Sequence, residues 1–159
     1  MSEKTERLKQ KLIDARADLD QTLDAVGNRW QEQVYSDGAA WNVHQLLLHL
    51  TEAERGHLNL LIGIMEGREV VPADFDINRY NKRSVEKKAD VSVEDARQTL
   101  TETRQRVLEW VDSIEDDALE KTGRHPSMNI FSVSQILKIM ALHEKDHARD
   151  IRSALHLNE

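Results

Sequence analysis

Leu142-His143-Glu144-Lys145-Asp146-His147-Ala148, near the C-terminus, is the stretch on which the interpretation of this chain depends. Residues four apart on a helix lie about 6 Å apart along its axis and return to nearly the same face. His143 and His147 can therefore direct two imidazoles at one site. Such pairs most often bind transition metals. Asp146 and Asp150, one or three residues away from His147, are candidates for orienting its ring by proximity in sequence alone.

The two histidines lie on the inward stripe of a predicted helix that begins at the cap residue Ser132, with Gln135 as its capping-box partner. Apolar residues continue the stripe at steps of three and four on both sides, which predicts that both imidazoles face the core. Core histidines that hydrogen-bond to neighbours would show the same pattern. We favour a metal site, because burying two imidazoles without a shared partner is costly. The stripe comprises Val133, Ile136, Met140, His143, His147, Ile151 and Ala154.

Taken literally, the stretch also matches H-E-x-x-H, the helix motif of zinc metalloproteases. The surrounding sequence argues against a protease. Only 12 residues follow His147, none of them in a G-x-x-H arrangement, and no predicted strand precedes the motif to align a peptide. Glu144 lies about 100° round the helix from His143, so we expect it to be exposed.

Three more helices are predicted upstream from hydrophobic periodicity. The first covers about residues 3–26. The second, about 43–66, begins with a capping box in which Asn42 is the cap and Gln45 the third helical residue. Its apolar residues cover more than one stripe, so it is either central or covered by another subunit. The third helix begins after Ser92 and continues to about Ile114.

A long connection from Arg68 to about Val91 separates the second and third long helices. Links of this length are uncommon inside compact domains and are usually crossovers or binding elements. We interpret it as a crossover, which allows two helical hairpins to pack without strict alternation of direction. Part of Asn78–Lys88 is expected to form a short helix.

Composition favours one all-α domain over residues 1–159. The chain has six Gly, two Pro, 4% aromatic and 32% charged residues, which suits helices with solvated faces. A net charge of −7 argues against nucleic-acid binding, and no run approaches the roughly 20 apolar residues of a membrane span. The charged N-terminus is no secretory signal, and the absence of Cys fits a reducing compartment, so we expect a cytoplasmic protein.

A metal site needs a third ligand, and the second helix offers His44, His49 and His57. His44 follows the cap closely and is expected to be exposed. His49 and His57 are eight residues apart, about 12 Å along a helix, so both cannot bind one ion. Spacing does not choose between them. His125, in a loop, and His156, at the chain end, are expected to be solvated.

Three features, in this order and spacing, resemble the DinB-like four-helix-bundle family. The resemblance implies an up-down-down-up bundle with a long crossover between helices two and three. It also implies a divalent metal, commonly nickel or zinc, held by His49, His143 and His147, and it is the resemblance that selects His49. Members often form homodimers. The features are Trp41 followed eight residues later by His49-Leu50, the crossover segment Asp74-Phe75-Asp76-Ile77-Asn78-Arg79-Tyr80-Asn81, and the last helix with His143, His147 and Ile151.

The resemblance further implies a metal-dependent enzyme with a small-molecule substrate. The family is similar to thiol transferases, which would add a low-molecular-weight thiol as cofactor, and to detoxifying hydrolases. One alternative is a stress-response protein that binds a metal or ligand without turnover. Another is a structural helical dimer whose histidines are polar core groups. A three-histidine site does not separate the first two, because binding and catalysis share the same ligands.

Overall fold

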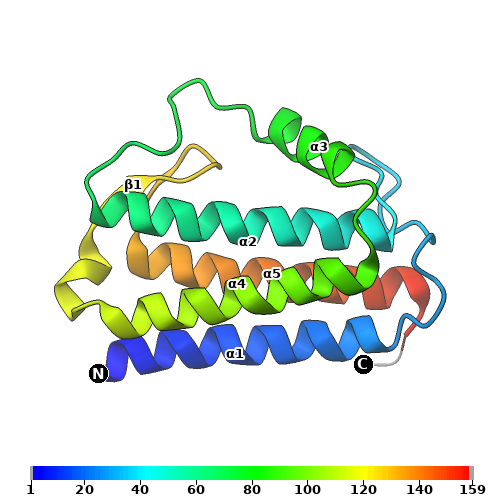
Figure 1. Cartoon of the computed structure of the whole chain (residues 1–159), viewed down its shortest axis with the longest axis horizontal. Coiled ribbons are helices and arrows are strands. Elements are labelled where there is room, and N and C mark those ends of the chain that lie inside the picture. The colour runs from blue at the N-terminus through cyan, green and yellow to red at the C-terminus, as the bar shows by residue number, and fades with distance from the viewer. Residues whose placement is uncertain (1, 158–159) are drawn as a thin grey trace.

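The structure, a computed structural model, describes residues 2–157, and its four long helices lie side by side (Figure 1). They are α1 (Glu3–Asp24), α2 (Val43–Met65), α4 (Val93–Ser113) and α5 (Val133–Leu155). The connections hold α3 (Ile77–Lys87), the 3-10 helix η1 (Asp116–Glu120), and an antiparallel hairpin of β1 (Thr122–Arg124) and β2 (Ile130–Ser132).

The helix directions confirm the up-down-down-up bundle. In Figure 1, α1 and α5 run one way and α2 and α4 run the other. The helix α1 packs mainly on α5, and α2 packs on both α4 and α5. Because α2 and α4 are parallel, the chain between them must return along the whole bundle, which is the reason for the long crossover. The short helix expected in this crossover is α3.

Both predicted capping boxes are present. The Asn42 side chain accepts from the backbone N–H of Gln45 at 2.8 Å, and the Gln45 side chain accepts from Asn42 N–H at 3.0 Å. Ser132 and Gln135 make the same pair of bonds at 3.1 and 2.8 Å. Each box satisfies two backbone donors that the first turn of a helix leaves free. The starts of α2 and α5, which carry the candidate histidines, are thereby defined.

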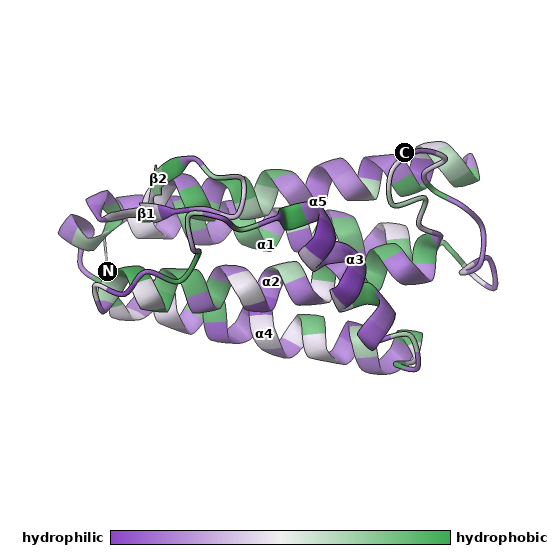
Figure 2. Cartoon of the chain, turned by 90° about the horizontal axis from the view of Figure 1, so that it is seen from above, coloured by the Kyte–Doolittle hydropathy of each residue, from purple (hydrophilic) through white to green (hydrophobic). Residues whose placement is uncertain are grey.

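The helix α2 is central. Besides α4 and α5, it contacts α3, which lies across its outer side (Figure 2). This explains the breadth of its apolar surface without a second subunit. The helix α3 itself is mostly hydrophilic, and its one buried residue is Val85.

A layer of buried charge divides the core into two apolar clusters. Each long helix contributes one residue to it: Arg16 from α1, Glu54 from α2, Arg104 from α4 and Glu144 from α5. Arg104 donates to Glu54 at 2.7 and 3.0 Å, and both arginines donate to Glu144. A further N–H of each arginine reaches a backbone carbonyl, that of Leu100 or Leu12. Burial alone would lower the pKa of Arg104. The neighbouring carboxylates of Glu54 and Glu144 outweigh this effect, so the pKa of Arg104 is raised.

The expectation that Glu144 is exposed is therefore wrong. Its side chain is only 3% exposed, because α1 packs against the side of α5 that carries it. Arg16 and Arg104 provide the counter-charges that make this burial tolerable. Glu144 consequently points away from the candidate site and into the core.

None of the helices within residues 2–157 combines the length and apolar composition that a membrane span requires.

Candidate metal centre

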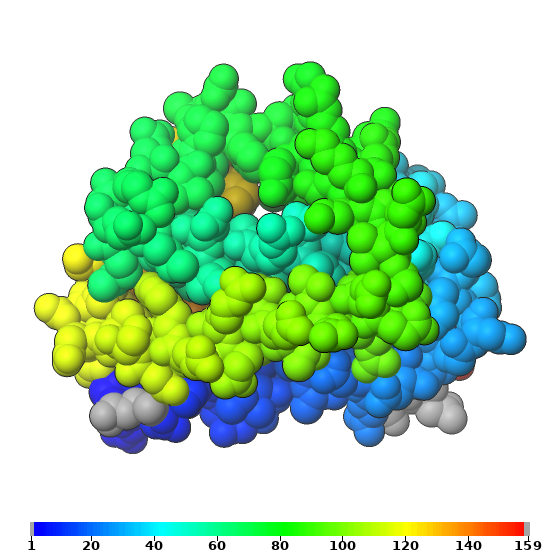
Figure 3. Space-filling view, viewed as in Figure 1, coloured from blue at the N-terminus to red at the C-terminus, as the bar shows by residue number. Residues whose placement is uncertain are grey.

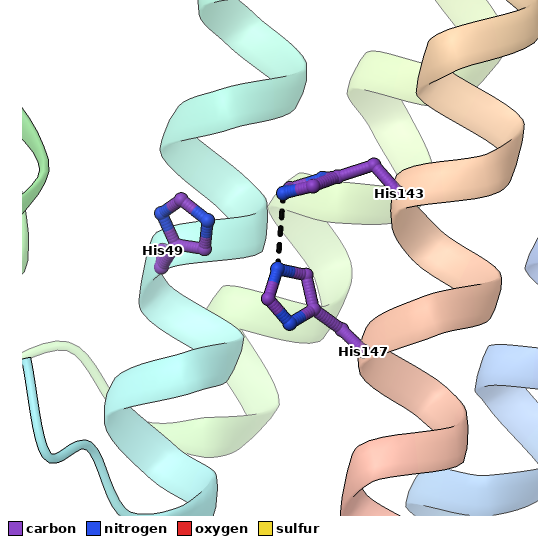
Figure 4. A group of neighbouring side chains, drawn as sticks. All are labelled: His49, His143 and His147. Atoms are coloured by element: carbon purple, nitrogen blue, oxygen red, sulfur yellow. Dashed lines mark hydrogen bonds between the residues drawn. The ribbon is translucent and has the colours of Figure 1, made fainter. Parts of the chain in front are cut away.

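The three histidines selected by the family resemblance converge between α2 and α5 (Figure 4). One ring nitrogen from each of His49, His143 and His147 can be chosen so that all lie within 4.8 Å of one another. The Nε2 atoms of His143 and His147 are 3.0 Å apart, as their i, i+4 spacing on α5 predicts. The His49 ring lies 5.3 and 5.4 Å from these two rings, centroid to centroid.

Trp41 holds the ring of His49. It precedes the cap of α2, and its indole lies 4.7 Å from the imidazole, with the planes inclined by 31°. The side chain of His49 is 6% exposed. The capping box that starts α2 therefore also places the Trp41 indole beside His49.

Tyr35 and Asp150 orient the ring of His147. The Tyr35 hydroxyl donates to the Asp150 carboxylate at 2.5 Å and lies 2.7 Å from His147 Nδ1. Since a hydroxyl has one proton and this one is given to Asp150, Nδ1 carries the proton of the second bond. The unprotonated Nε2 of His147 then faces His143 and His49. A ring fixed in this way is typical of histidines that bind metals.

The loop before α2 brings Tyr35 to this position. The backbone N–H groups of Val34 and Tyr35 both donate to the carbonyl of Trp41, at 2.9 and 3.2 Å, so the loop folds back on itself. From the sequence, Tyr35 was expected in an ordered loop whose aromatic residues close one end of the core. Its contact with His147 was not predicted, because its partners on α5 are more than 110 residues away. Of the two candidate acidic residues, Asp150 contacts this network, whereas Asp146 pairs with Arg149.

The electrostatic environment keeps the three imidazoles neutral. Burial, reinforced by the neighbouring His143 and His147, lowers the pKa of His49 to about 3. Burial, with His143 next to it, lowers the pKa of His147 to about 4. The pKa of His143 is also lowered by burial. Neutral imidazoles offer lone pairs at pH 7, the form in which histidine binds metals.

The donor set fits a divalent ion. Zinc–imidazole bonds are about 2.0–2.1 Å long, so two nitrogens on one ion are at most about 4.2 Å apart. The span of 4.8 Å among the three nitrogens is slightly wider, and small rotations of the side chains would close it. Three neutral nitrogen ligands with no thiolate or carboxylate suit zinc, nickel or a similar transition metal.

The remaining histidines differ from the sequence-based expectations in two cases. His125 is buried rather than solvated, and its Nε2 lies 2.9 Å from Nε2 of His57. His44 is partly buried, and its Nε2 donates to the carbonyl of Val91 at 2.8 Å. His125 follows the strand β1, whose pairing with β2 folds the loop against α2; this hairpin had no signal in the sequence. His156 is exposed, as expected.

A cavity of about 170 Å³ adjoins His49 and His143. It lies between α2, α5, the crossover with α3, and the hairpin loop that carries His125. The crossover therefore lines this cavity as well as connecting α2 to α4.

The sequence matches the DinB superfamily over residues 11–151. YfiT from Bacillus subtilis, described as "a probable metal-dependent hydrolase with an unusual four-helix bundle topology", has a similar structure, with a TM-score of 0.76. The alignment covers 98% of this chain and 89% of that chain at 16% identity, so the likeness concerns the fold alone. No match was found among curated protein sequences.

Proposed function

This chain belongs to the DinB superfamily, and from that premise we propose that it is a divalent-metal-dependent enzyme acting on a small molecule. We propose further that His49, His143 and His147 hold the ion, with nickel or zinc as the candidates. The observation that carries the proposal is the convergence of three neutral imidazoles from two helices, one of them held in a fixed tautomer by Tyr35.

The residues around the site define what each would contribute. When bound by three neutral imidazoles, a divalent ion keeps its full charge and lowers the pKa of a coordinated water or thiol toward neutrality. Trp41 and Tyr35 fix the rings of His49 and His147, so the ligands are oriented before an ion arrives. The adjoining cavity offers space for a substrate next to His49 and His143.

Two reaction classes agree with this arrangement. Hydrolysis is supported by the description of YfiT, which shares the fold. Transfer to a low-molecular-weight thiol is implied by the family resemblance, and the chain has no cysteine of its own to provide the sulfur. We propose detoxification or stress response as the setting of either reaction, in the cytoplasm and as a homodimer.

The metal assignment is tested by substituting one ligand. We expect His147→Ala to abolish stoichiometric nickel or zinc binding, because the two remaining imidazoles, His49 on α2 and His143 on α5, are too few to hold the ion. Elemental analysis of the purified protein and equilibrium dialysis against each metal measure the occupancy. His156→Ala serves as the matched control, since this exposed histidine lies at the end of α5. Full occupancy in His147→Ala would refute the assignment.

The second candidate function is binding of a metal or ligand without turnover, which the same three histidines would serve. Screening the metal-loaded protein with low-molecular-weight thiols, electrophiles and ester or amide substrates separates the two. Turnover that disappears in His147→Ala supports the enzyme. A metal-loaded protein that is inactive across the screen would support the binding protein instead.

A further inference from the structure

The cavity beside the histidines opens between α2 and the crossover. Figure 3 shows this surface hollowed between α2 and the crossover with α3 above it. His49 and His143 form one part of its wall. Apolar side chains from three different segments form much of the remainder, among them Phe75, Ile77 and Ile139.

Two further histidines in the cavity wall, His57 and His125, are also uncharged. The Nδ1–H of His57 donates to the carbonyl of Ala53 at 2.8 Å, which leaves Nε2 as an acceptor. His125 accepts at Nδ1 from the N–H of Ser127 at 3.1 Å, so its Nε2–H donates to His57. All four ring nitrogens are therefore committed within this network. Toward the cavity these rings offer carbon and no free donor.

Charge is nearly absent from the cavity wall. Within the part of the chain that the structure describes, Glu52 is the only charged residue among those that line the cavity. Its carboxylate pairs with Arg55 at 3.2 Å. In the metal-free chain, an anionic ligand would find no lysine or arginine in the wall, and would lose its hydration without compensation.

Gly56 keeps this space open. It lies in the middle of α2, where glycine destabilises a helix relative to alanine. Packing does not require it, because a Cβ at this position would meet no atom within 4 Å. Gly56 lines the cavity, so a side chain there would occupy part of it.

Asn81, from α3, supplies a polar group at the wall. Its side-chain amide forms no hydrogen bond with any residue in the described range 2–157, and it lines the cavity. A primary amide can both donate and accept, so it suits a carbonyl, amide or hydroxyl group.

We propose that this cavity binds a small uncharged molecule with an apolar body, that Asn81 hydrogen-bonds its polar group, and that Gly56 leaves the space for it. This inference rests on the proposed function, because it makes the bound molecule the substrate of the adjoining metal site. It narrows the part of the substrate that lies in this cavity to uncharged groups, and leaves a negative charge only to a group that binds the ion itself.

The test is a titration of the ¹⁵N-labelled full chain, freed of metal by a chelator, with benzamide, benzoate and benzylamine. The three probes share a ring and differ in charge, and removal of metal prevents benzoate from binding an ion directly. We expect benzamide to shift the backbone amide signals of Ala53, Gly56 and Asn81. Benzoate and benzylamine should bind with at least ten-fold lower affinity. If benzoate bound with the same affinity as benzamide, the inference would be overturned.

Two variants locate the binding. Gly56→Leu should lose benzamide binding, whereas Asn59→Leu, which adds the same side chain at an exposed position of α2, should keep it. Asn81→Leu should weaken the binding of benzamide but not the binding of toluene, which has no polar group. Benzamide binding that is retained in Gly56→Leu would refute the location.

Metal content keeps the two proposals distinguishable. Gly56→Leu should bind metal at the wild-type ratio, because the three imidazoles do not include this residue. A wild-type chain that binds benzamide but no metal would refute the proposed function and leave the pocket in place. A chain that binds metal but none of the probes would overturn the pocket alone.

Discussion

The Tyr35 hydroxyl determines which nitrogen of His147 is available. Its single proton goes to Asp150, so it accepts the Nδ1–H of His147 and leaves Nε2 free on the side of His143. The tautomer and the rotamer of His147 are therefore already fixed in the folded protein, so metal binding does not have to select them. A partner of this kind typically contributes 10–100-fold to metal affinity.

Tyr35→Phe is therefore expected to weaken zinc or nickel binding about 10–100-fold without abolishing it. The ring remains in place and only the hydrogen bonds to His147 and Asp150 are lost. Competition with a chromophoric chelator measures the dissociation constant. Tyr80→Phe, at the chain's other tyrosine, is the control and should bind as the wild type does. Equal affinities in the two variants would contradict this role of Tyr35.

Single residues were predictable where local periodicity determines their position. The spacing of His143 and His147 placed both on one face of α5, and the structure brings their Nε2 atoms together. Exposure was predicted wrongly for Glu144 and His125, because their partners come from segments distant in sequence. The contact of Tyr35 with His147 was not predicted, since a loop tyrosine gives no indication of which helix it will meet.

The helices themselves are specified largely by their first turns. Ser132 and Gln135 close the start of α5, and Asn42 and Gln45 close the start of α2. Hydrophobic periodicity and these boxes were sufficient to predict all four long helices. The hairpin was not predictable, because β1 and β2 have three residues each and so are too short for an alternating pattern to appear.

Ser132→Ala is expected to destabilise the protein by about 1 kcal/mol. The substitution removes the acceptor for the N–H of Gln135 and frees the Gln135 side chain. Urea unfolding followed by circular dichroism gives the change in unfolding free energy. Ser153→Ala, at an exposed position inside α5, should not destabilise the chain. A loss of the same size in both variants would show that the cap contributes nothing.

At the scale of the whole molecule, the charged layer joins all four long helices. Arg16, Glu54, Arg104 and Glu144 are each at most 8% exposed and balance to zero net charge. A buried cluster of this kind is sensitive to the loss of one member, because the remaining charges stay buried without compensation.

Glu144→Gln is expected to lower the unfolding free energy by about 3–5 kcal/mol. The shape is kept, but Arg16 and Arg104 lose half of their counter-charge. Removing one charge of each sign, in Arg104→Met with Glu144→Leu, should recover part of the loss, because Arg16 and Glu54 remain as a pair at 3.4 Å.

Chemical unfolding of these variants measures both effects. Arg7→Ala is the reference: its exposed ion pair with Glu3, at 2.6 Å, should contribute less than about 1 kcal/mol. If Glu144→Gln lowered the unfolding free energy by no more than Arg7→Ala does, the charged layer would not be a determinant of stability.

The metal-free protein is expected to lose stability as the pH falls below about 6.5. The folded-state pKa is about 3 for His49 and His57 and about 4 for His147, all below the ordinary value of 6.5. Between these values the unfolded chain binds protons that the folded chain excludes, so the unfolding free energy decreases with falling pH. Each such histidine contributes a slope that approaches about 1.4 kcal/mol per pH unit. Urea midpoints that are the same at pH 7.5 and pH 5 would contradict this.

The turn from His143 to His147 belongs to two structures at once. His143 and His147 face the candidate metal centre, while Glu144 between them enters the charged layer of the core. Adding or deleting one residue in this turn would rotate the following part of α5 by about 100° relative to the part before it. The side chains on the two sides of the change would then no longer face the same partners, so both the metal centre and the charged layer would be disrupted. Changes in chain length are therefore excluded from this turn. The spacing of the two histidines is thus fixed by the metal centre and by the charged layer together.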